Sequence, residues 1–305
     1  MPPGRWSLPA VVLLGLVIFA WGANYLFVRV GLMSASPLWL AALRAGVGGL
    51  GFGAYLLVAG RGPPMDRAQR WRAVALGVPN TSIFLGLWFV AAVEVPPGQA
   101  AVVIYTFPLW VALFSIPLLR RQLNAVQWAA IALGFGGVLL LSEPWTGGGD
   151  IDRLLPLVEL VGAAVSWAIA TVLAQRWFHP NEMLRVNGYQ LAGGSAVLLA
   201  VALLLVPRPL PTPTPSLVIA TLWLALYGTA FAYGVWFWLL GRIPASTLST
   251  FLFLVPLVAL ADSAVFLHER LDWTQGIGVA AVVVGIYGIA RAGEPAPVPR
   301  RRDET

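Results

Sequence analysis

Ten long apolar stretches follow one another along this 305-residue chain, separated by short segments rich in Gly, Pro and Arg. About 20 apolar residues in a helix cross the roughly 30 Å hydrocarbon core of a bilayer. Only 10% of the residues are charged, against about 25% in soluble domains. The chain is therefore predicted to be an all-α polytopic membrane protein with ten transmembrane helices. The predicted helices cover residues 8–30, 37–59, 71–93, 98–119, 126–143, 154–175, 187–206, 216–240, 245–267 and 273–291.

The basic residues lie mostly in the segments on one side of these helices. By the positive-inside rule this side is cytoplasmic, which places both termini in the cytoplasm and the multi-pass protein in the cell inner membrane. The net charge of +6 is spread over short segments, so no nucleic-acid partner is expected. The first apolar run continues without a cleavage site of small residues, and it predicts a helix instead of a secretory signal.

The second half of the sequence repeats the first half. At an offset of 148 residues, polar and special residues align as well as apolar ones. The aligned pairs include Pro96 with Pro244, Pro108 with Pro256, Ser115 with Ser263, Gln127 with Gln275 and Gly137 with Gly285. We expect one integrated transmembrane domain with a five-helix repeat in 1–150, a second in 151–292, and a disordered cytoplasmic tail in 293–305. Because five is odd, the second repeat enters from the opposite face, an inverted topology typical of secondary transporters.

One motif in the second repeat, Leu267-His268-Glu269-Arg270-Leu271, is followed by Gln275, Gly276 and Gly285. Together with the ten-helix repeat pattern, it resembles the drug/metabolite transporter superfamily in its EamA-type branch, over essentially the whole chain. Arg121 stands in the first repeat where the resemblance expects Glu. The resemblance implies a secondary transporter that exports small molecules by alternating access. The tryptophan-rich interior is similar to that of the YddG-type exporters of aromatic amino acids.

Deep aromatic and amide side chains are the candidates for lining a central cavity. Trp21 and Trp167 are related by the repeat, lie mid-membrane and have small or polar neighbours. An indole N–H or an amide within hydrocarbon needs a polar partner or a wet cavity, although packing against another helix is the alternative for each residue. The predicted cavity residues are Trp21, Asn24, Asn80, Tyr105, Trp167, Gln190 and Tyr233.

Three prolines inside predicted helices are candidate hinges. Pro108 and Pro256 are repeat partners, and each removes a backbone hydrogen bond to the carbonyl four residues earlier, that of Ile104 or Leu252. Pro79, midway along the third helix, is the other candidate. Simple helix curvature is the alternative interpretation.

Ionisable side chains are rare within the predicted helices. Arg44 aligns with Gln190 of the second repeat, and Asp262 lies in the ninth helix. For Arg44 we prefer snorkelling or a structural bond to backbone carbonyls, and an anion site or a gate that pairs with Asp262 is the functional alternative. The first helix contains no Asp or Glu, which argues against a cationic substrate and favours a neutral or zwitterionic one.

The preferred function is export of hydrophobic or aromatic amino acids, or of similar small neutral or zwitterionic metabolites. An exporter of other metabolites or drugs is the alternative, and both proton coupling through Asp262 and facilitated diffusion fit the sequence. A membrane enzyme or a channel is a distant alternative, because no catalytic set, metal motif or filter loop occurs. We expect no catalytic residue, metal or cofactor. The expected partners are a small-molecule substrate and the lipid bilayer, and the sequence carries no signal for an oligomeric state.

Overall fold

The computed structural model describes residues 8–59, 63–142, 151–206, 210–243, 245, 248, 251–268, 272–292 and 296–297. Within this part of the chain, seven helices are long and apolar enough to cross a membrane, and three shorter apolar helices accompany them. These correspond to the ten predicted stretches, so the all-α polytopic fold is confirmed. We number them spans 1 to 10.

Five spans make up the first repeat, and spans 3 and 4 are interrupted. Span 1 is α1 (Leu8–Leu32), span 2 is α2 (Pro37–Ala59), span 3 contains α3 (Arg67–Gly77), the π-helix η1 (Val78–Ile83) and α4 (Phe84–Ala91), span 4 contains α5 (Pro97–Ile104) and α6 (Phe107–Leu119), and span 5 is α7 (Ala125–Ser142).

The second repeat has the same plan, with interruptions in spans 8 and 9. Span 6 is α8 (Ile151–Trp177), span 7 contains the 3-10 turn η2 (Pro180–Glu182) and α9 (Met183–Leu205), span 8 contains α10 (Pro215–Leu222), the π-helix η3 (Trp223–Phe231) and α11 (Ala232–Leu240), span 9 contains the 3-10 turn η4 (Phe251–Phe253) and α13 (Leu254–Phe266), and span 10 is α14 (Trp273–Arg291).

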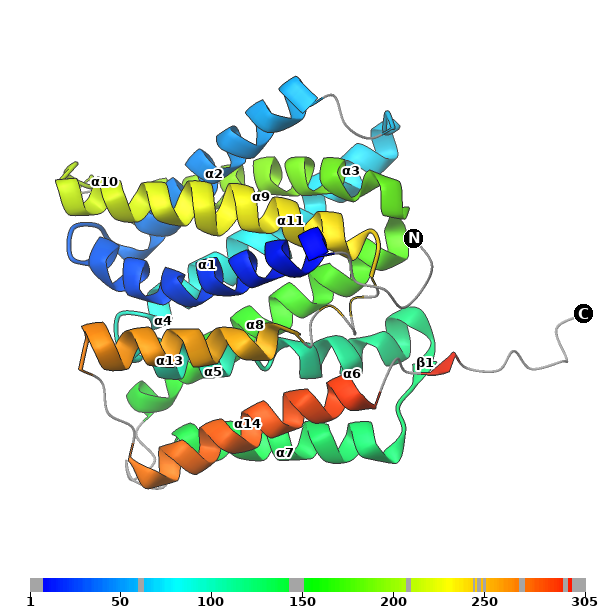
Figure 1. Cartoon of the computed structure of the whole chain (residues 1–305). Helices are drawn as coiled ribbons and strands as arrows, with labels where there is room; N and C mark the ends of the chain where they lie inside the picture. The colour runs from blue at the N-terminus through cyan, green and yellow to red at the C-terminus, as the bar shows by residue number, and fades with distance from the viewer. Residues whose placement is uncertain are drawn as a thin grey trace, which may run out of the picture.

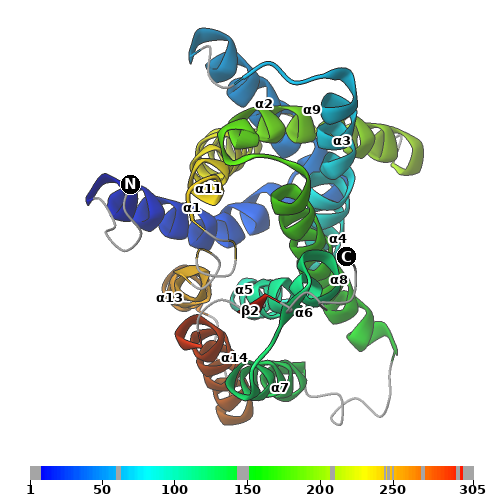
Figure 2. The same ribbon diagram turned by 90° about the vertical axis from the view of Figure 1, so that its right-hand side faces the viewer.

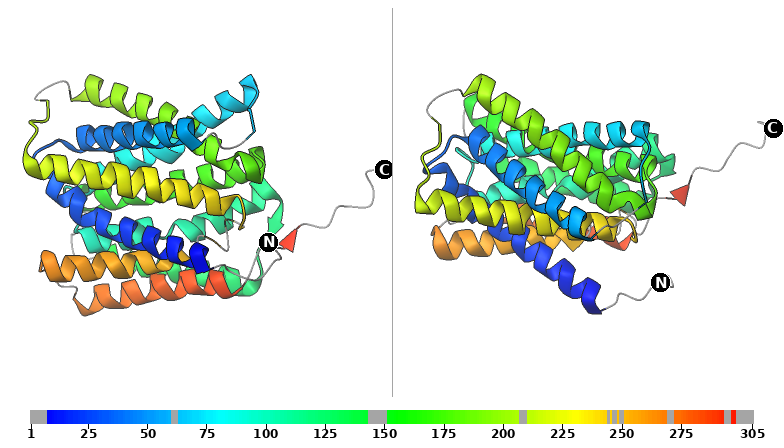
Figure 3. Two further views of the ribbon diagram at one scale, coloured as in Figure 1. Left: turned by 45° about the horizontal axis from the view of Figure 1, so that its top comes forward. Right: turned by 90° about the horizontal axis from the view of Figure 1, so that it is seen from above.

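The spans run side by side between the two ends of the molecule (Figure 1, Figure 3). α1 begins and α14 ends at the same end of the bundle, as an even number of crossings requires (Figure 1). α7 and α14 pack against each other at one edge, and α2 packs against α9 toward the opposite edge (Figure 2). The aromatic core of the protein lies between these two pairs, among α1, α8, α11 and the interrupted spans 3 and 4.

Repeat-related residues form the same local structures. Span 5 begins with a reciprocal cap. Asn124 Oδ1 accepts from the backbone N–H of Gln127, and Gln127 Oε1 accepts from the backbone N–H of Asn124. Asp272 and Gln275 form the equivalent capping box at the start of α14. The aligned glutamines of the two repeats are thus helix caps. One turn earlier along the chain, the repeat partners Arg120 and His268 both adopt left-handed backbone, with φ of 51° and 56°.

Glycines let the paired spans approach closely, again in repeat-related positions. A Cβ atom added at Gly137 of α7 would lie 2.6 Å from the carbonyl oxygen of Gly278, and one at Gly285 of α14 would lie 2.7 Å from that of Ala130. Small residues of this kind allow transmembrane backbones to pack without intervening side chains. The α7–α14 contact therefore has an internal two-fold relation.

Both π-helices occupy equivalent places in the two repeats. η1 widens the middle of span 3 and contains Pro79, while η3 widens the middle of span 8 and contains Gly228. π-helical segments inside α-helices are rare and frequently occur at functional sites. The chain is consequently irregular at mid-membrane in both repeats, and this requires nearby protein or cavity polar groups to satisfy its backbone.

A two-residue antiparallel pair joins the strand β1 (Arg121–Gln122) to β2 (Ala296–Pro297), with Arg121 opposite Pro297. Ala296–Pro297 belong to the segment 293–305, whose disorder stays a prediction. The remaining residues of that segment lie outside the described part of the chain.

Candidate functional site

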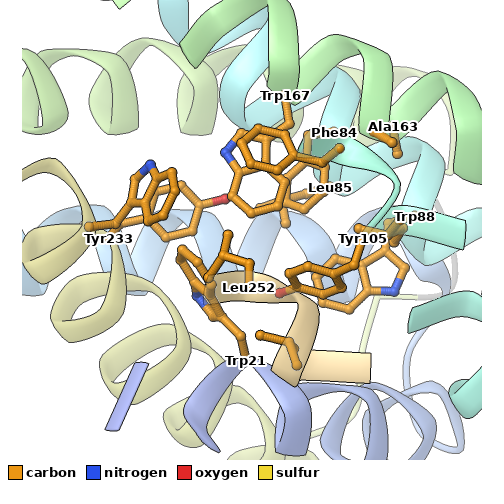
Figure 4. Packing of buried hydrophobic residues seen from close by; sticks show 14 of the residues in the cluster. Trp21, Phe84, Leu85, Trp88, Tyr105, Ala163, Trp167, Tyr233 and Leu252 are labelled. Carbon is orange, nitrogen blue, oxygen red and sulfur yellow. The ribbon is translucent and has the colours of Figure 1, made fainter. Parts of the chain in front are cut away.

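A cluster of aromatic rings from both repeats fills the centre of the bundle (Figure 4). Trp21 of α1 and Trp167 of α8 meet edge to face, with ring centroids 5.4 Å apart and an interplanar angle of 88°. Phe107, beside the break in span 4, stacks on Trp167 at 4.0 Å. Trp236 of α11 lies 5.6 Å from Trp21 and 6.0 Å from Trp167. The two repeat-related tryptophans are thus in direct contact.

The cluster continues with hydroxyl-bearing rings. Tyr233 lies 5.8 Å from Trp21, and Tyr105 lies 6.0 Å from Trp167. Tyr25 contacts Trp88 at 4.8 Å. These tyrosines give an otherwise apolar core several hydrogen-bonding groups at one depth.

A small void of about 10 Å³ lies at the centre of this cluster. It is lined by Trp21, Asn24, Tyr25, Arg44, Phe84, Trp88, Tyr105, Trp167 and Tyr233. Such a volume holds about one water molecule. The centre is therefore closed in this conformation, and a metabolite requires the spans to move apart.

Several polar atoms at the void have no hydrogen-bond partner within the described part of the chain. They are both amide atoms of Asn24, Nη1 of Arg44, the indole N–H groups of Trp88 and Trp167, and the hydroxyl of Tyr233. A buried polar group without a partner costs about 1–3 kcal/mol, so a cluster of them at one point needs an explanation. A polar ligand that enters an opened form of the void supplies these partners.

Arg44 of α2 is 1% exposed and is anchored on the π-helix η3. Its Nε donates to the Thr229 hydroxyl at 3.0 Å, and its Nη2 donates to the Gly228 carbonyl at 3.5 Å. The Trp21 indole N–H donates to the same carbonyl at 3.0 Å. The guanidinium carbon lies 4.9 Å from the centre of the Trp88 ring. A widened turn of span 8 thus positions the buried charge of span 2.

The second repeat contains the same crossing with an amide in place of the charge. Gln190 of α9 accepts from the Thr81 hydroxyl at 2.7 Å and donates to Asn187 Oδ1 at 2.8 Å. Thr81 lies in η1 at the position equivalent to Thr229 in η3. Gln190 is therefore a partner of the π-helix. It was predicted to line the cavity, but it is not among the residues that line the void.

Asn80 and Asp262 also lie away from the void lining. Asn80 is 2% exposed within η1, and its Nδ2 has no partner. Asp262 is half-buried on α13. Among the described side chains, the partners of Arg44 are Thr229, Gly228 and aromatic rings, so the predicted Arg44–Asp262 pair is absent.

The two central prolines each follow a break in a span. Pro108 is the second residue of α6, after the turn at Tyr105–Thr106, and Pro256 is the third residue of α13, directly after the 3-10 turn η4. Proline is tolerated in the first turn of a helix because the missing N–H has no intrahelical partner there. Both repeats therefore interrupt the equivalent span beside the aromatic cluster.

The cavity residues predicted from the sequence leave out Tyr25, Phe84 and Trp88, which line the void, and Phe107, which stacks on Trp167. Tyr25 lies four residues after Trp21, so the helical period places both on one face of α1. That spacing was the available signal for Tyr25. For Phe84 and Phe107 no signal existed, because apolar rings near mid-membrane face lipid as often as protein.

A larger apolar groove of about 530 Å³ shares no lining residue with the void. Its lining residues belong to α1, α2, α9, η3 and α11, and include Leu13, Phe52, Tyr55, Val235 and Trp238. Gly234 and Val235 of the groove directly follow Tyr233 of the void. The groove lies toward the end at which α1 begins, since Leu13 is near the start of α1 and Tyr55 is near the end of α2.

Comparisons with known proteins agree with this architecture. PecM of Dickeya dadantii is 34% identical over 268 residues, which cover 86% of each chain. The probable amino-acid metabolite efflux pump of Escherichia coli K12 is 28% identical, with 90% of this chain and 93% of the pump covered. A crystal structure 22% identical in sequence shares the fold, with a TM-score of 0.67 over 93% of this chain and 98% of the other.

The match to a family occurs twice along the chain, once in each half. The sequence pattern of the EamA-like transporter family fits residues 8–143 and again residues 155–291. A further relative, 27% identical over 283 residues, is the uncharacterized inner membrane transporter YedA of Escherichia coli K12. The chain belongs to the EamA-like transporter family, within the drug/metabolite transporter superfamily, and is a multi-pass inner membrane transporter and not an enzyme.

Proposed function

We propose that this transporter exports small hydrophobic or aromatic amino acids, or similar neutral or zwitterionic metabolites, by alternating access. The observation that carries the proposal is the central void, which aromatic rings and unpaired polar groups of both repeats surround. Flat rings complement an aromatic or aliphatic side chain, and the polar atoms complement its backbone groups. One relative is named a probable amino-acid metabolite efflux pump, which supports the same substrate class.

The proposed movement uses the irregular points of the spans. Rocking of the two repeats, 1–150 against 151–292, would open the closed centre first toward one side and then toward the other. Pro108, Pro256 and Pro79 are the proposed hinges, since each lies at a break or a π-helix where few α-helical bonds must be broken. We propose that α1 begins on the cytoplasmic side, as the distribution of Arg predicts. The apolar groove then forms the cytoplasmic approach to the site.

The groove favours a second candidate function. Its volume of about 530 Å³ and its largely apolar lining suit a larger hydrophobic compound better than an amino acid. Export of apolar metabolites or drugs is therefore the alternative, with the groove as the first binding site.

Transport by the purified full-length protein in liposomes tests both candidates. We expect saturable uptake of labelled Phe, Trp and Leu, no uptake of Lys, and no inhibition of Phe uptake by excess Lys. Lys uptake equal to Phe uptake would overturn the proposal. Strong inhibition of Phe uptake by hydrophobic drugs without any amino-acid selectivity would favour the second candidate.

An imposed pH gradient in the same assay tests coupling. If Asp262 carries a proton during the cycle, the gradient accelerates wild-type transport and has no effect on Asp262→Asn. If transport is facilitated diffusion, the gradient changes neither protein.

A further inference from the structure

Among the residues that the structure describes, the charge of Arg44 has no acidic partner. Arg44 and Glu182 are the only charged side chains that are buried among the residues whose burial the structure describes. Glu182 is satisfied elsewhere, because it accepts from Gln69 Nε2 and from the His179 backbone amide. Charges inside proteins are normally paired with an opposite charge, since desolvation is expensive. The site around Arg44 is thus built with one uncompensated positive charge.

The guanidinium group also has spare hydrogen-bonding capacity at the void. A guanidinium group has five N–H donors, and the bonds to Thr229 and Gly228 use one on Nε and one on Nη2. Nη1 has no partner among the described residues, although Arg44 lines the void. The other groups that line the void around it are aromatic rings and the Asn24 amide. An incoming group would therefore meet free donors on a fixed cation.

The second repeat supplies an internal comparison. Gln190 occupies the position equivalent to Arg44 and makes the equivalent bond to a π-helix threonine, Thr81. Its amide is neutral and has partners in both Thr81 and Asn187. A neutral glutamine is therefore sufficient to bond the two spans where they cross in the second repeat. The fold does not require a charge at the equivalent position of Arg44. The charge of Arg44 needs a different reason.

We infer that Arg44 is the anchor for the carboxylate of the transported molecule. This inference rests on the proposed function and redefines its substrate class as monocarboxylates with an aromatic or aliphatic body, which include amino acids and also carboxylates without an ammonium group. Paired oxygens of a carboxylate match the planar fork of a guanidinium, and one negative charge neutralises the site. A phosphate carries about −1.5 to −2 charges at pH 7 and would exceed the single cation present.

The α-ammonium of an amino acid has no comparable partner. Among the described residues, no Asp or Glu lines the void. An ammonium there would meet only ring faces, hydroxyls and an amide. The carboxylate is consequently the required group and the ammonium is dispensable, so that amino acids are one subset of the accepted monocarboxylates.

Three compounds with one aromatic body separate these contributions. L-phenylalanine has both charged groups, 3-phenylpropionate has only the carboxylate, and 2-phenylethylamine has only the ammonium. Affinity of each is measured by thermal stabilisation and by inhibition of labelled Phe transport. The proteins are wild type, Arg44→Gln, Arg44→Lys and, as a matched control, Arg29→Gln. Arg29 is an exposed arginine of α1 that donates to the Val93 carbonyl and is not among the residues that line the void.

We expect wild type to bind 3-phenylpropionate at least as tightly as Phe. It should bind 2-phenylethylamine at least about tenfold more weakly than Phe, because this compound lacks the carboxylate that forms the charge-assisted pair with Arg44. Arg44→Gln, which copies the Gln190 arrangement, should fold and lose at least about tenfold for both carboxylates. Arg44→Lys should keep the order of preference with a smaller loss, and Arg29→Gln should match wild type.

Two results would overturn the inference. One is that wild-type protein binds 2-phenylethylamine as tightly as Phe. This measurement uses wild-type protein alone, so it does not depend on whether a variant folds. The other is unchanged Phe affinity in a folded Arg44→Gln protein. Either result leaves Phe transport, and hence the proposed function, intact. Wild-type protein that neither binds nor transports any of the three compounds overturns the proposed function together with the inference.

Discussion

Replacing Gly48 by Ala tests how tightly span 2 is set against the π-helix of span 8. The added Cβ would lie 2.8 Å from the Ala225 carbonyl oxygen and 2.8 Å from Thr229 Cβ. Ordinary contacts between heavy atoms are about 3.5 Å or more, so the backbones must separate by roughly half an ångström or more. Overpacking of this kind costs about 1–3 kcal/mol of stability. Because Thr229 accepts from Arg44, the shift also disturbs the site.

Gly46, half a turn earlier on the same helix, is the matched control. An added Cβ there meets nothing within 4 Å. Gly46→Ala should therefore leave stability unchanged or raise it by up to about 1 kcal/mol, because alanine is the better helix former. Gly194, the repeat partner of Gly48, faces Gly77 and Thr81 in the same way, with Thr81 Cβ 2.5 Å from the added atom. Gly194→Ala should behave like Gly48→Ala.

The assay is the free energy of unfolding in detergent, measured beside transport of Phe in liposomes. Gly48→Ala and Gly194→Ala should lose about 1–3 kcal/mol and transport more slowly, while Gly46→Ala matches or exceeds wild type. Equal stability of Gly48→Ala and Gly46→Ala would refute the close crossing and, with it, the positioning of Arg44 by η3.

Three further expectations concern hinges, the anchor and orientation. Pro108→Ala should leave the unfolding free energy nearly unchanged, because proline in the first turn of a helix interrupts no intrahelical bond, yet should slow transport; unchanged transport would remove its role as a hinge. Thr229→Val leaves Nε of Arg44 without its acceptor and should cost about 1–3 kcal/mol, measured by chemical denaturation; a loss below about 0.5 kcal/mol would show that the bond contributes little. In this cysteine-free chain, Met33→Cys should react with an impermeant thiol reagent in intact cells and Pro64→Cys should not; the reverse pattern would invert the topology.

The fold could be predicted from the sequence because membrane-spanning length and repeat matches are local properties of the chain. The alignment of Gln127 with Gln275 corresponds to two equivalent helix caps. The equivalent depth of Trp21 and Trp167 in related helices predicted that both line a central cavity, and the contact between their rings is an observation of the structure. Depth and repeat symmetry are therefore readable before any tertiary structure is known.

Side-chain partners across helices were harder to predict, because they depend on helix rotation and crossing angle. Gln190 and Arg44 were placed correctly at one depth, but nothing in the sequence indicates that each bonds a threonine of the other repeat. Asp262 has the charge to pair with Arg44 and lies half-buried on another span. The π-helices likewise have only a weak local signal, such as Pro79 in η1.

The central claim is that substrate passes through the aromatic site between the repeats, which opens alternately to the two sides. Asn24 lines the void and has no hydrogen-bond partner, so Asn24→Cys introduces a thiol at the site in a chain without other cysteines. The decisive measurement is the rate at which an impermeant thiol reagent labels this variant from each side of oriented liposomes. Alternating access predicts labelling from both sides and slower labelling from both in the presence of Phe. Labelling from one side only, or rates that Phe leaves unchanged, would contradict it.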